Sequence, residues 1–239
     1  MLDALSELRL LAETPIRYRQ QLLAFKQFFL TRRCTVLLLD DASGTLGDPH
    51  GQSVLHGVMV LERLRAAWGN ERRQLRITKL RGRFYRSGMH DYEIRRGGLE
   101  VFPRLGPAPS CGKAPQRALP SGIPRLDALL GGGPCAGSST LLMGAAGVGK
   151  TTIAMQYAIS AARRGEVAAV FSFDETLATL ESRLAQVGLD PEPLVRAGLL
   201  HIHHVDPVEM SPGEFASRVC AAVERDGARV VVVDSLNGY

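Results

Sequence analysis

The chain has 239 residues with a formal net charge of +5, and 45% of its residues are hydrophobic and 22% charged. These proportions are those of an ordinary globular protein and exclude an intrinsically disordered chain. The arginines are scattered along the sequence. The positive charge therefore favours a solvated surface, and nucleic acid is not an expected partner.

No apolar run is long enough to span a membrane, and Asp3, Glu7 and Arg9 interrupt any secretory signal. The 4 cysteines form no Cys-X-X-Cys pair, which favours free thiols over a disulfide framework or a zinc site. The sequence therefore predicts a cytoplasmic protein with no membrane partner.

The first part of the chain is expected to contain a long helix followed by strands. Apolar residues recur at helical spacing over residues 15–32, and residues 34–40 form a continuous apolar run, as in a buried parallel strand. A polar loop is expected over residues 40–52, and then strands at residues 57–61, 74–80, 92–95 and 99–102. Prolines and glycines mark residues 105–117 as a linker.

Beyond the linker the pattern becomes an alternation of strands and helices. Strands are expected at residues 139–143, 167–173, 199–204 and 229–234, and helices at residues 150–163, 175–187 and 213–226. Such alternation predicts an α/β fold with a mostly parallel, twisted sheet and helices on both faces. The strands of the first region form a separate, β-rich segment.

Residues 144–152, Gly-Ala-Ala-Gly-Val-Gly-Lys-Thr-Thr, are a complete phosphate-binding loop between an expected strand and an expected helix. Lys150 is placed to reach the β- and γ-phosphates of a nucleotide, and the Thr151 hydroxyl to hold Mg²⁺. Three glycines let backbone N–H groups turn toward the anion: Gly144, Gly147 and Gly149. The alternative is an accidental glycine-rich turn, which the flanking patterns disfavour.

The last apolar strand ends on Asp234, where an acid beside the phosphate loop is suited to holding Mg²⁺. The tetrapeptide Leu2-Asp3-Ala4-Leu5 resembles Val233-Asp234-Ser235-Leu236, about one domain length later. This similarity favours a tandem array cut at the same point in two successive modules. A coincidental pair of Asp-X-Leu sequences is the alternative.

Residues 121–133, Ser-Gly-Ile-Pro-Arg-Leu-Asp-Ala-Leu-Leu-Gly-Gly-Gly, resemble the opening of KaiC-like members of the RecA superfamily, and the phosphate loop and the strand of Asp234 follow in order. The first region resembles the closing half of a preceding KaiC module, through residues 3–9, 17–21, 35–41, 72–82 and 90–94. The resemblance implies a RecA-like P-loop NTPase fold. It divides the chain into the end of one module (1–104), a linker (105–117) and the head of the next module (118–239), as in a fragment of a two-module protein.

The same resemblance implies roles for particular residues. Lys150, Thr151 and Thr152 would bind the phosphates of ATP and Mg²⁺, with Asp234 near the metal. The Lys-X-Arg-Gly segment of the family, which reaches toward the nucleotide of a neighbouring subunit, falls on residues 79–82. Lys79 and Arg81 are thus candidate trans-acting residues, and the alternative is a charged strand in solvent.

Two adjacent acids of the family fall on Asp174 and Glu175, at the end of an expected strand. The family usually has two glutamates, so Asp174 shortens one side chain by a methylene. Glu175 is the expected general base, because an acid at the carboxyl end of a parallel strand beside a phosphate loop suits that work. Alternatively, Asp174 caps the next helix and Glu175 lies in its first turn.

His201 and His203 share one face of an expected strand, which raises the question of a metal site. No carboxylate or cysteine nearby completes a ligand set. Surface or half-buried histidines are therefore the preferred interpretation.

The resemblance implies an ATPase of the KaiC type, with serine/threonine autokinase activity as the finer expectation. It implies a homo-oligomeric, hexameric ring and signalling or clock-type protein partners. Two alternatives stay open: a nucleotide-binding remnant without turnover, and a RecA-type DNA-dependent ATPase. A further hypothesis joins the two halves into one permuted sheet, with residues 35–40 beside residues 230–234.

Overall fold

The computed structural model of the chain describes residues 2–3, 5–41, 49–65, 70–106 and 117–235. They belong to two compact units, Met1–Leu61 with Leu75–Gly88, and Glu62–Gln74 with Met89–Tyr239. Most of the predicted linker, residues 107–116, lies outside the described residues. The division into two module halves therefore stays a prediction.

Three helices build the core of the first unit: α1 (Leu5–Leu11), α2 (Pro15–Thr31) and α3 (Pro49–Val54). The predicted long helix is confirmed as α2. Its start is fixed by Thr14, whose hydroxyl accepts the N–H of Arg17 at 3.3 Å, as in an N-cap. The buried residues that pack between these helices are apolar: Leu5, Ala12, Tyr18, Leu22 and Val54.

The apolar run at residues 34–40 forms a shorter and more exposed strand than expected. Strand β2 (Leu38–Leu39) pairs in parallel with β1 (Leu2–Asp3), and the two form a sheet of their own among the described residues. Leu37 is 68% exposed and Leu39 is 42% exposed. Burial of a parallel strand on both faces requires packed layers on both faces. Among the described residues, β2 lies in a sheet of only two strands. The prediction of a parallel strand is confirmed, and the prediction that it is buried is wrong.

The four further strands predicted in the first region are confirmed. They hydrogen-bond in chain order as a four-stranded sheet: β3 (Gly57–Leu64), β4 (Arg72–Leu80), β5 (His90–Arg95) and β6 (Gly98–Phe102). Strands β5 and β6 form an antiparallel hairpin. This hairpin belongs to the second unit.

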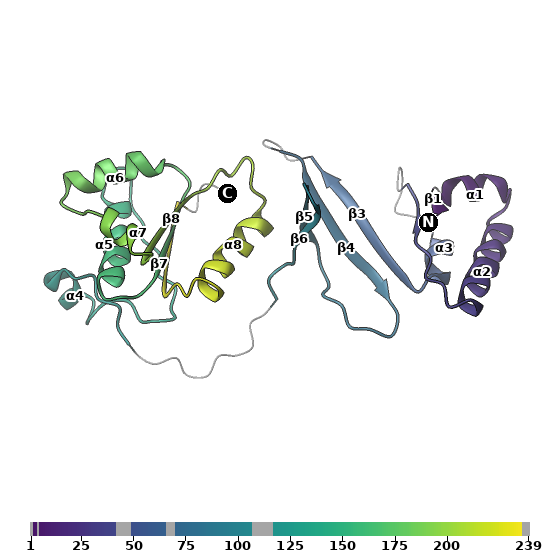
Figure 1. Ribbon diagram of the computed structural model, residues 1–239, viewed down its shortest axis with the longest axis horizontal. Coiled ribbons are helices and arrows are strands. Elements are labelled where there is room, and N and C mark those ends of the chain that lie inside the picture. Colours follow the sequence, from purple (N-terminus) through teal and green to yellow (C-terminus); the bar gives the residue numbers. More distant parts are fainter. Residues whose placement is uncertain (1, 4, 42–48, 66–69, 107–116, 236–239) are drawn as a thin grey trace. The chain divides into compact units, whose positions relative to one another are not determined.

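The second unit contains a parallel sheet with the strand order β8 (Leu200–His204), β7 (Ala168–Ser172), β9 (Val230–Asp234) (Figure 1). Its helices are α4 (Pro124–Leu129), α5 (Lys150–Arg163), α6 (Leu177–Gln186), α7 (Glu192–Arg196) and α8 (Pro212–Glu224). Each predicted helix and each predicted strand after residue 150 is present.

Alternate residues of the central strand β7 face two separate cores. Ala168 and Val170 pack with α5 and α6, whereas Ala169 and Phe171 pack with α8. All five residues of β7 are buried. A strand covered on both faces reads as a continuous apolar run, which is why periodicity located it correctly. The predicted α/β arrangement with helices on both faces is confirmed.

The expected strand at residues 139–143 does not form. No described strand pairs with this segment, and Leu141 and Met143 are 64% and 84% exposed. Both edges of β7 are already occupied, by β8 and β9. The outer edge of β9 pairs with no described strand. An extended apolar segment counts as a strand only when it pairs, and among the described residues this segment pairs with no strand.

Strand pairing also rejects the permuted-sheet hypothesis. Strand β2 pairs with β1, and β9 pairs with β7, so the two segments that the hypothesis joins lie in different sheets.

Candidate nucleotide-binding site

The phosphate-binding loop enters α5 through glycines in the left-handed backbone region. Gly147 has φ 79°, and Gly149, with φ 95°, is the N-cap residue of α5. A side chain at either position would strain the backbone. The loop therefore delivers the N-terminus of a long helix, whose free N–H groups favour an anion.

Lys150 extends back over this loop. Its Nζ donates to the carbonyl oxygens of Gly144 at 2.9 Å and Ala145 at 2.8 Å. The ammonium group thus lies close to the loop backbone rather than pointing into solvent. This arrangement concentrates positive charge beside the N-terminus of α5.

A second contact joins the loop to the end of β9. The Thr151 hydroxyl lies 2.5 Å from Oδ2 of Asp234, although the two residues are 83 positions apart in the sequence. A hydroxyl and a carboxylate are oxygen ligands of the kind that Mg²⁺ prefers, and Mg²⁺ commonly takes its remaining ligands from phosphates and water. The pair thus fits a cation shared with a nucleotide.

The segment Ser121–Asp127 holds α5 in place. The Ser121 hydroxyl and the Ser121 N–H both donate to Oδ1 of Asp127 at 2.7 Å. The hydrogen bond from the Ser121 hydroxyl is the main cause of the lowered pKa of Asp127. Gln156 of α5 then donates to the Ser121 carbonyl oxygen at 2.8 Å. This segment, which carries the family resemblance, therefore sets the position of the helix behind the loop.

The two candidate acids follow β7, and the structure decides between two interpretations of Asp174. The N-cap residue of α6 is Thr176, whose hydroxyl accepts the N–H of Thr179. Asp174 is exposed and Glu175 is half-buried, and both precede the helix. Capping of α6 therefore does not explain Asp174, and that alternative is wrong.

Three residues that sequence reasoning missed surround Glu175. The N–H of Glu175 donates to Oγ of Ser172, which in turn donates to the Glu175 carbonyl oxygen at 3.1 Å. His204 Nδ1 lies 3.1 Å from the same carbonyl oxygen, and Arg183 Nη2 lies 3.1 Å from Glu175 Oε2. The parallel register of Ser172 opposite His204 explains the histidine contact. No local pattern marks Arg183, because only the packing of α6 brings it here.

The histidines of β8 do not form a metal site with other side chains in the described residues. The ring of His203 stacks on Phe171, with 5.0 Å between the ring centroids. Burial lowers the pKa of His203, and repulsion from His201 lowers it further. The preferred interpretation, a half-buried aromatic neighbour of the core, accounts for this geometry.

Lys79 and Arg81 lie in the first unit, whereas the phosphate loop lies in the second. Lys79 Nζ donates to the carbonyl oxygens of Gln52 at 2.8 Å and Ser53 at 3.0 Å, and Arg81 donates to that of Ser53 at 3.0 Å. Partial burial lowers the pKa of Lys79, helped by the positive charges of Arg81 and Lys26. Both cations thus bind the carboxyl-terminal end of α3.

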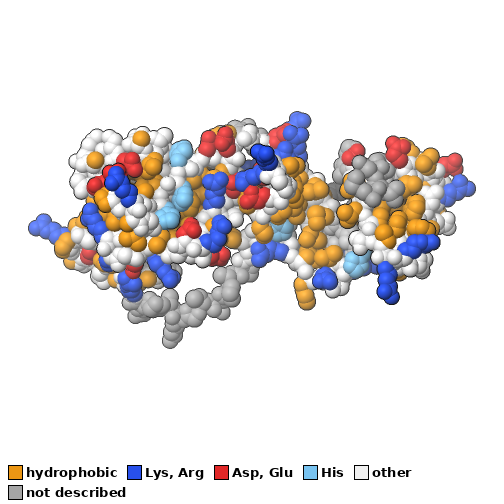
Figure 2. All heavy atoms as spheres, viewed as in Figure 1, with side chains coloured by type: hydrophobic (Ala, Val, Ile, Leu, Met, Phe, Trp, Pro, Cys, Tyr) orange, Lys and Arg blue, Asp and Glu red, His pale blue; other side chains and the backbone are white. Residues whose placement is uncertain are grey.

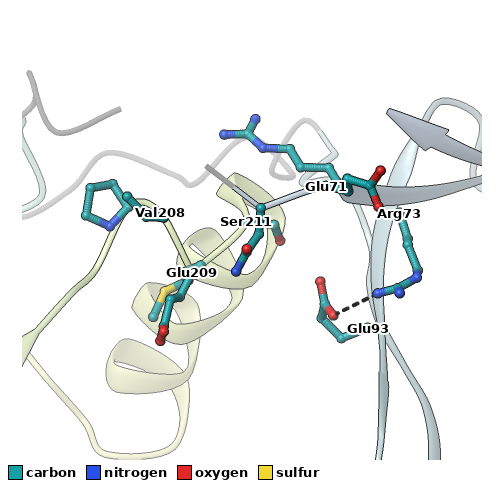
Figure 3. Close-up of a pocket in the computed structure, with 10 residues that line it drawn as sticks. Glu71, Arg73, Glu93, Val208, Glu209 and Ser211 are labelled. Carbon is teal, nitrogen blue, oxygen red and sulfur yellow. Dashed lines mark ion pairs between the residues drawn. The ribbon is translucent and has the colours of Figure 1, made fainter. Parts of the chain in front are cut away.

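A separate cavity of about 250 Å³ lies between β4, β5 and the loop before α8 (Figure 3). Figure 3 shows Arg73 and Glu93 paired on the strand side of the cavity, with 3.6 Å between the charged groups. Its lining mixes acids and bases: Asn70, Glu71, Arg72, Arg73, Glu93, Pro207, Val208, Glu209, Met210 and Ser211. None of the predicted nucleotide-binding residues lines it. It is therefore not the predicted site.

Comparison with known proteins gives consistent matches. A sequence model of the family described as "ATPase: KaiC" matches residues 1–106 and 119–239. The circadian clock oscillator protein KaiC of Picosynechococcus sp. is 30% identical over 166 residues, which are 70% of this chain and 32% of that protein. The KaiC of Rippkaea orientalis is 34% identical over 131 residues, 55% of this chain and 25% of that protein. KaiC 1 of Synechocystis sp. is 28% identical over 166 residues, 70% of this chain and 32% of that protein.

The chain thus spans about a third of the length of the first of these relatives, 32%. Among the helices that the structure describes, none is both long and apolar enough to cross a membrane.

Proposed function

Because the chain belongs to the KaiC family of RecA-like P-loop ATPases, we propose that its second unit binds ATP with Mg²⁺ and hydrolyses it. One observation carries most of the proposal. The Thr151 hydroxyl and the Asp234 carboxylate meet at 2.5 Å beside the N-terminus of α5, so two oxygen ligands for Mg²⁺ lie at the end of a phosphate loop.

The remaining roles follow from chemistry and position. Gly144, Gly147 and Gly149 would expose backbone N–H groups to the phosphates, and Lys150 would exchange its two carbonyl partners for phosphate oxygens. Thr152, in the first turn of α5, would add a hydroxyl beside them. Mg²⁺, when bound, would neutralise negative charge on the phosphate oxygens.

Glu175 would act as the general base. It is half-buried at the carboxyl end of the central strand, and its main chain is fixed by Ser172 and His204. A carboxylate held there would take the proton of the attacking water. Asp174, exposed beside it, would help to polarise that water. The proposal for Asp174 and Glu175 rests on the family pattern and on this position.

Two substitutions test binding and chemistry separately. We expect Lys150→Ala to weaken ATP binding about 100-fold, because a cation beside the phosphates is lost. Glu175→Gln should leave binding within about twofold and reduce the hydrolysis rate about 100-fold, the scale of a lost general base. The measurements are titration with a fluorescent ATP analogue and steady-state hydrolysis. Lys26→Ala, on α2 of the first unit, is the matched lysine control.

The outcomes also separate the alternatives. Unchanged turnover in Glu175→Gln would remove Glu175 from the mechanism. Binding of ATP by the unaltered chain without any turnover would favour the nucleotide-binding remnant. Hydrolysis that DNA stimulates, with binding that weakens steeply as salt rises, would favour the RecA-type DNA-dependent ATPase.

The finer parts of the function are further proposals. We propose a homo-oligomeric ring, hexameric in form, that contains two modules per full-length chain and works in the cytoplasm with signalling or clock-type protein partners. Lys79 and Arg81 would act in trans on a neighbour's nucleotide. Light scattering with and without ATP tests the ring, and the sequence of the transcript beyond both ends of this chain tests the two-module arrangement.

Serine/threonine autokinase activity is the second enzymatic proposal, and it rests on the resemblance to the KaiC family. Mass spectrometry of the longer protein after incubation with Mg²⁺ and ATP would reveal phosphorylated serine or threonine. Hydrolysis of ATP without any phosphorylated serine or threonine would contradict the autokinase proposal and retain the ATPase proposal.

A further inference from the structure

We propose that Arg183 is a positioning residue for Glu175, holding one oxygen of its carboxylate so that the other stays available to the attacking water. The proposal rests on the function proposed above, since it refines how Glu175 works in ATP hydrolysis. It names a residue of α6 that neither the phosphate loop nor the acidic pair contains.

The contact between the two side chains is close and shielded from solvent. Arg183 Nη2 lies 3.1 Å from Glu175 Oε2. Both of these atoms, and also Arg183 Nε, are buried, although the two side chains as wholes are 39% and 28% exposed. The three atoms form no hydrogen bond with any described residue. The pair is therefore held by charge attraction in a shielded place, where such attraction is stronger than in water.

The main chain of Glu175 is already fixed on two sides, so the carboxylate is the one part left to orient. Ser172 bonds both the N–H and the carbonyl oxygen of Glu175. His204 contacts that carbonyl oxygen through Nδ1, and because a carbonyl only accepts, Nδ1 must carry the proton. What remains is rotation about the side-chain bonds of Glu175, and the cation at Oε2 restricts it.

This restriction matters for proton transfer. A general base has to lie within about 2.6–3.2 Å of the proton that it takes, with an oxygen free to accept it. Oε1 has no hydrogen-bond partner among the side chains and backbone that the structure describes, whereas Oε2 faces the guanidinium. Arg183 thus divides the carboxylate into a held oxygen and a reactive oxygen.

A purely structural ion pair would have different consequences. Partly exposed ion pairs contribute little to stability, and their loss does not change the chemistry of bound ATP. A positioning residue acts through its partner alone. Its removal should lower the rate of the chemical step, leave substrate binding unchanged and have no effect once Glu175 itself is altered.

The experiment is a double-mutant cycle in the full chain. The values of kcat and KM for ATP hydrolysis are measured for each variant, and the rates are normalised to the amount of bound nucleotide. We expect Arg183→Met to lower kcat about tenfold with KM within about twofold. Arg183→Lys, which keeps the charge, should recover at least half of the lost rate. In the Glu175→Gln background, Arg183→Met should change kcat by less than about twofold. Arg196→Met, which breaks the exposed ion pair with Glu192 on α7, is the matched control and should leave kcat unchanged.

Each other outcome overturns the inference. An equal loss of kcat in the presence and absence of Glu175, a change confined to KM, or a rate for Arg183→Met equal to that of the unaltered chain would each show that Arg183 does not work through Glu175. Failure of the proposed function is seen separately, as Glu175→Gln with full turnover or as an unaltered chain with none. Arg183→Lys keeps the test decisive if Arg183→Met does not fold.

Discussion

At the scale of single residues, the contact between Thr151 and Asp234 is the most informative in the molecule. The two oxygens lie 2.5 Å apart, and the residues belong to the start of α5 and the end of β9. The sequence predicted each residue as a ligand separately. The fold brings them together because α5 packs over β7 and β9, with its N-terminus at the carboxyl ends of these strands.

The hydroxyl of Thr151 is expected to set the requirement for Mg²⁺. Thr151→Ala should raise the Mg²⁺ concentration needed for half-maximal ATP binding about tenfold, because one oxygen ligand is lost. Thr151→Ser keeps that oxygen and is the matched control. A titration of nucleotide binding against Mg²⁺ measures the effect. Equal Mg²⁺ curves for the alanine and serine variants would contradict the assignment of Thr151 as a metal ligand.

His203 should make the second unit less stable in acid. Burial lowers its pKa in the folded chain, so the unfolded chain binds a proton at a higher pH than the folded chain does. Neutral, buried His203 therefore contributes to the stability of the folded chain. This stabilisation is complete above the ordinary histidine pKa of about 6.5, and it is lost as the pH falls from there toward the lowered pKa of the folded chain. His203→Phe, which keeps the stacking on Phe171, should flatten the dependence of Tm on pH between about 7 and 5. The same slope in both proteins would contradict the prediction.

At the scale of elements, the β5–β6 hairpin and helix α8 form one interface inside the second unit. Asp91 of β5 accepts the N–H of Gly213 at 2.8 Å, in the first turn of α8. Glu214 of α8 pairs with Arg95 of β5 at 2.7 Å and with Arg218 at 2.9 Å, and the hydrogen bond with Glu214 raises the pKa of Arg95. Residues from the two predicted module halves thus lie in one compact unit.

Glu214 carries the prediction at this scale. Its side chain is 6% exposed, whereas Arg95 and Arg218 are 46% and 52% exposed. Glu214→Gln should lower the free energy of unfolding by about 1–2 kcal/mol, less than for a fully buried pair because water still reaches both arginines. Glu192→Gln breaks an exposed pair with Arg196 and should cost no more than about 0.5 kcal/mol. Urea unfolding measures both, and equal losses would contradict the role of burial.

The elements also show which sequence patterns are reliable. The helix at residues 150–163 and the strand at residues 229–234 were predicted to within a residue, because their side chains face a packed core. Residues 34–40 and 139–143 are apolar runs as well. The first run contains a strand of only two residues, and the second forms no strand. The apolar composition of a segment indicates which side chains it could bury. The segment becomes a strand only when its backbone hydrogen-bonds to a neighbouring strand.

At the scale of the whole molecule, the chain has two compact units with separate cores, and the phosphate loop belongs to the second. Figure 2 shows apolar side chains on the surface of both units, as expected from exposed residues such as Leu37, Leu141 and Met143.

ATP with Mg²⁺ should stabilise the second unit and leave the first unchanged. A ligand present at 100 times its Kd stabilises the unit that binds it by about 2.7 kcal/mol. Hydrogen exchange should therefore slow in α5 and β9 on addition of the nucleotide and stay the same in α1 and α2. Lys150→Ala should remove the protection. Equal protection of α1 and α2 would show that the two units respond as one.

The sequence alone identified the residues on which the proposed chemistry rests. The phosphate loop, the acid at Asp234, the pair Asp174–Glu175 and the alternation of strands and helices are local patterns, and each depends on residues close together in the chain. The tertiary structure alone decided which of these residues meet and what surrounds them. The contacts of Glu175 with Arg183 and His204, and the missing partner of residues 139–143, depend on packing between distant segments, and no local pattern encodes that packing.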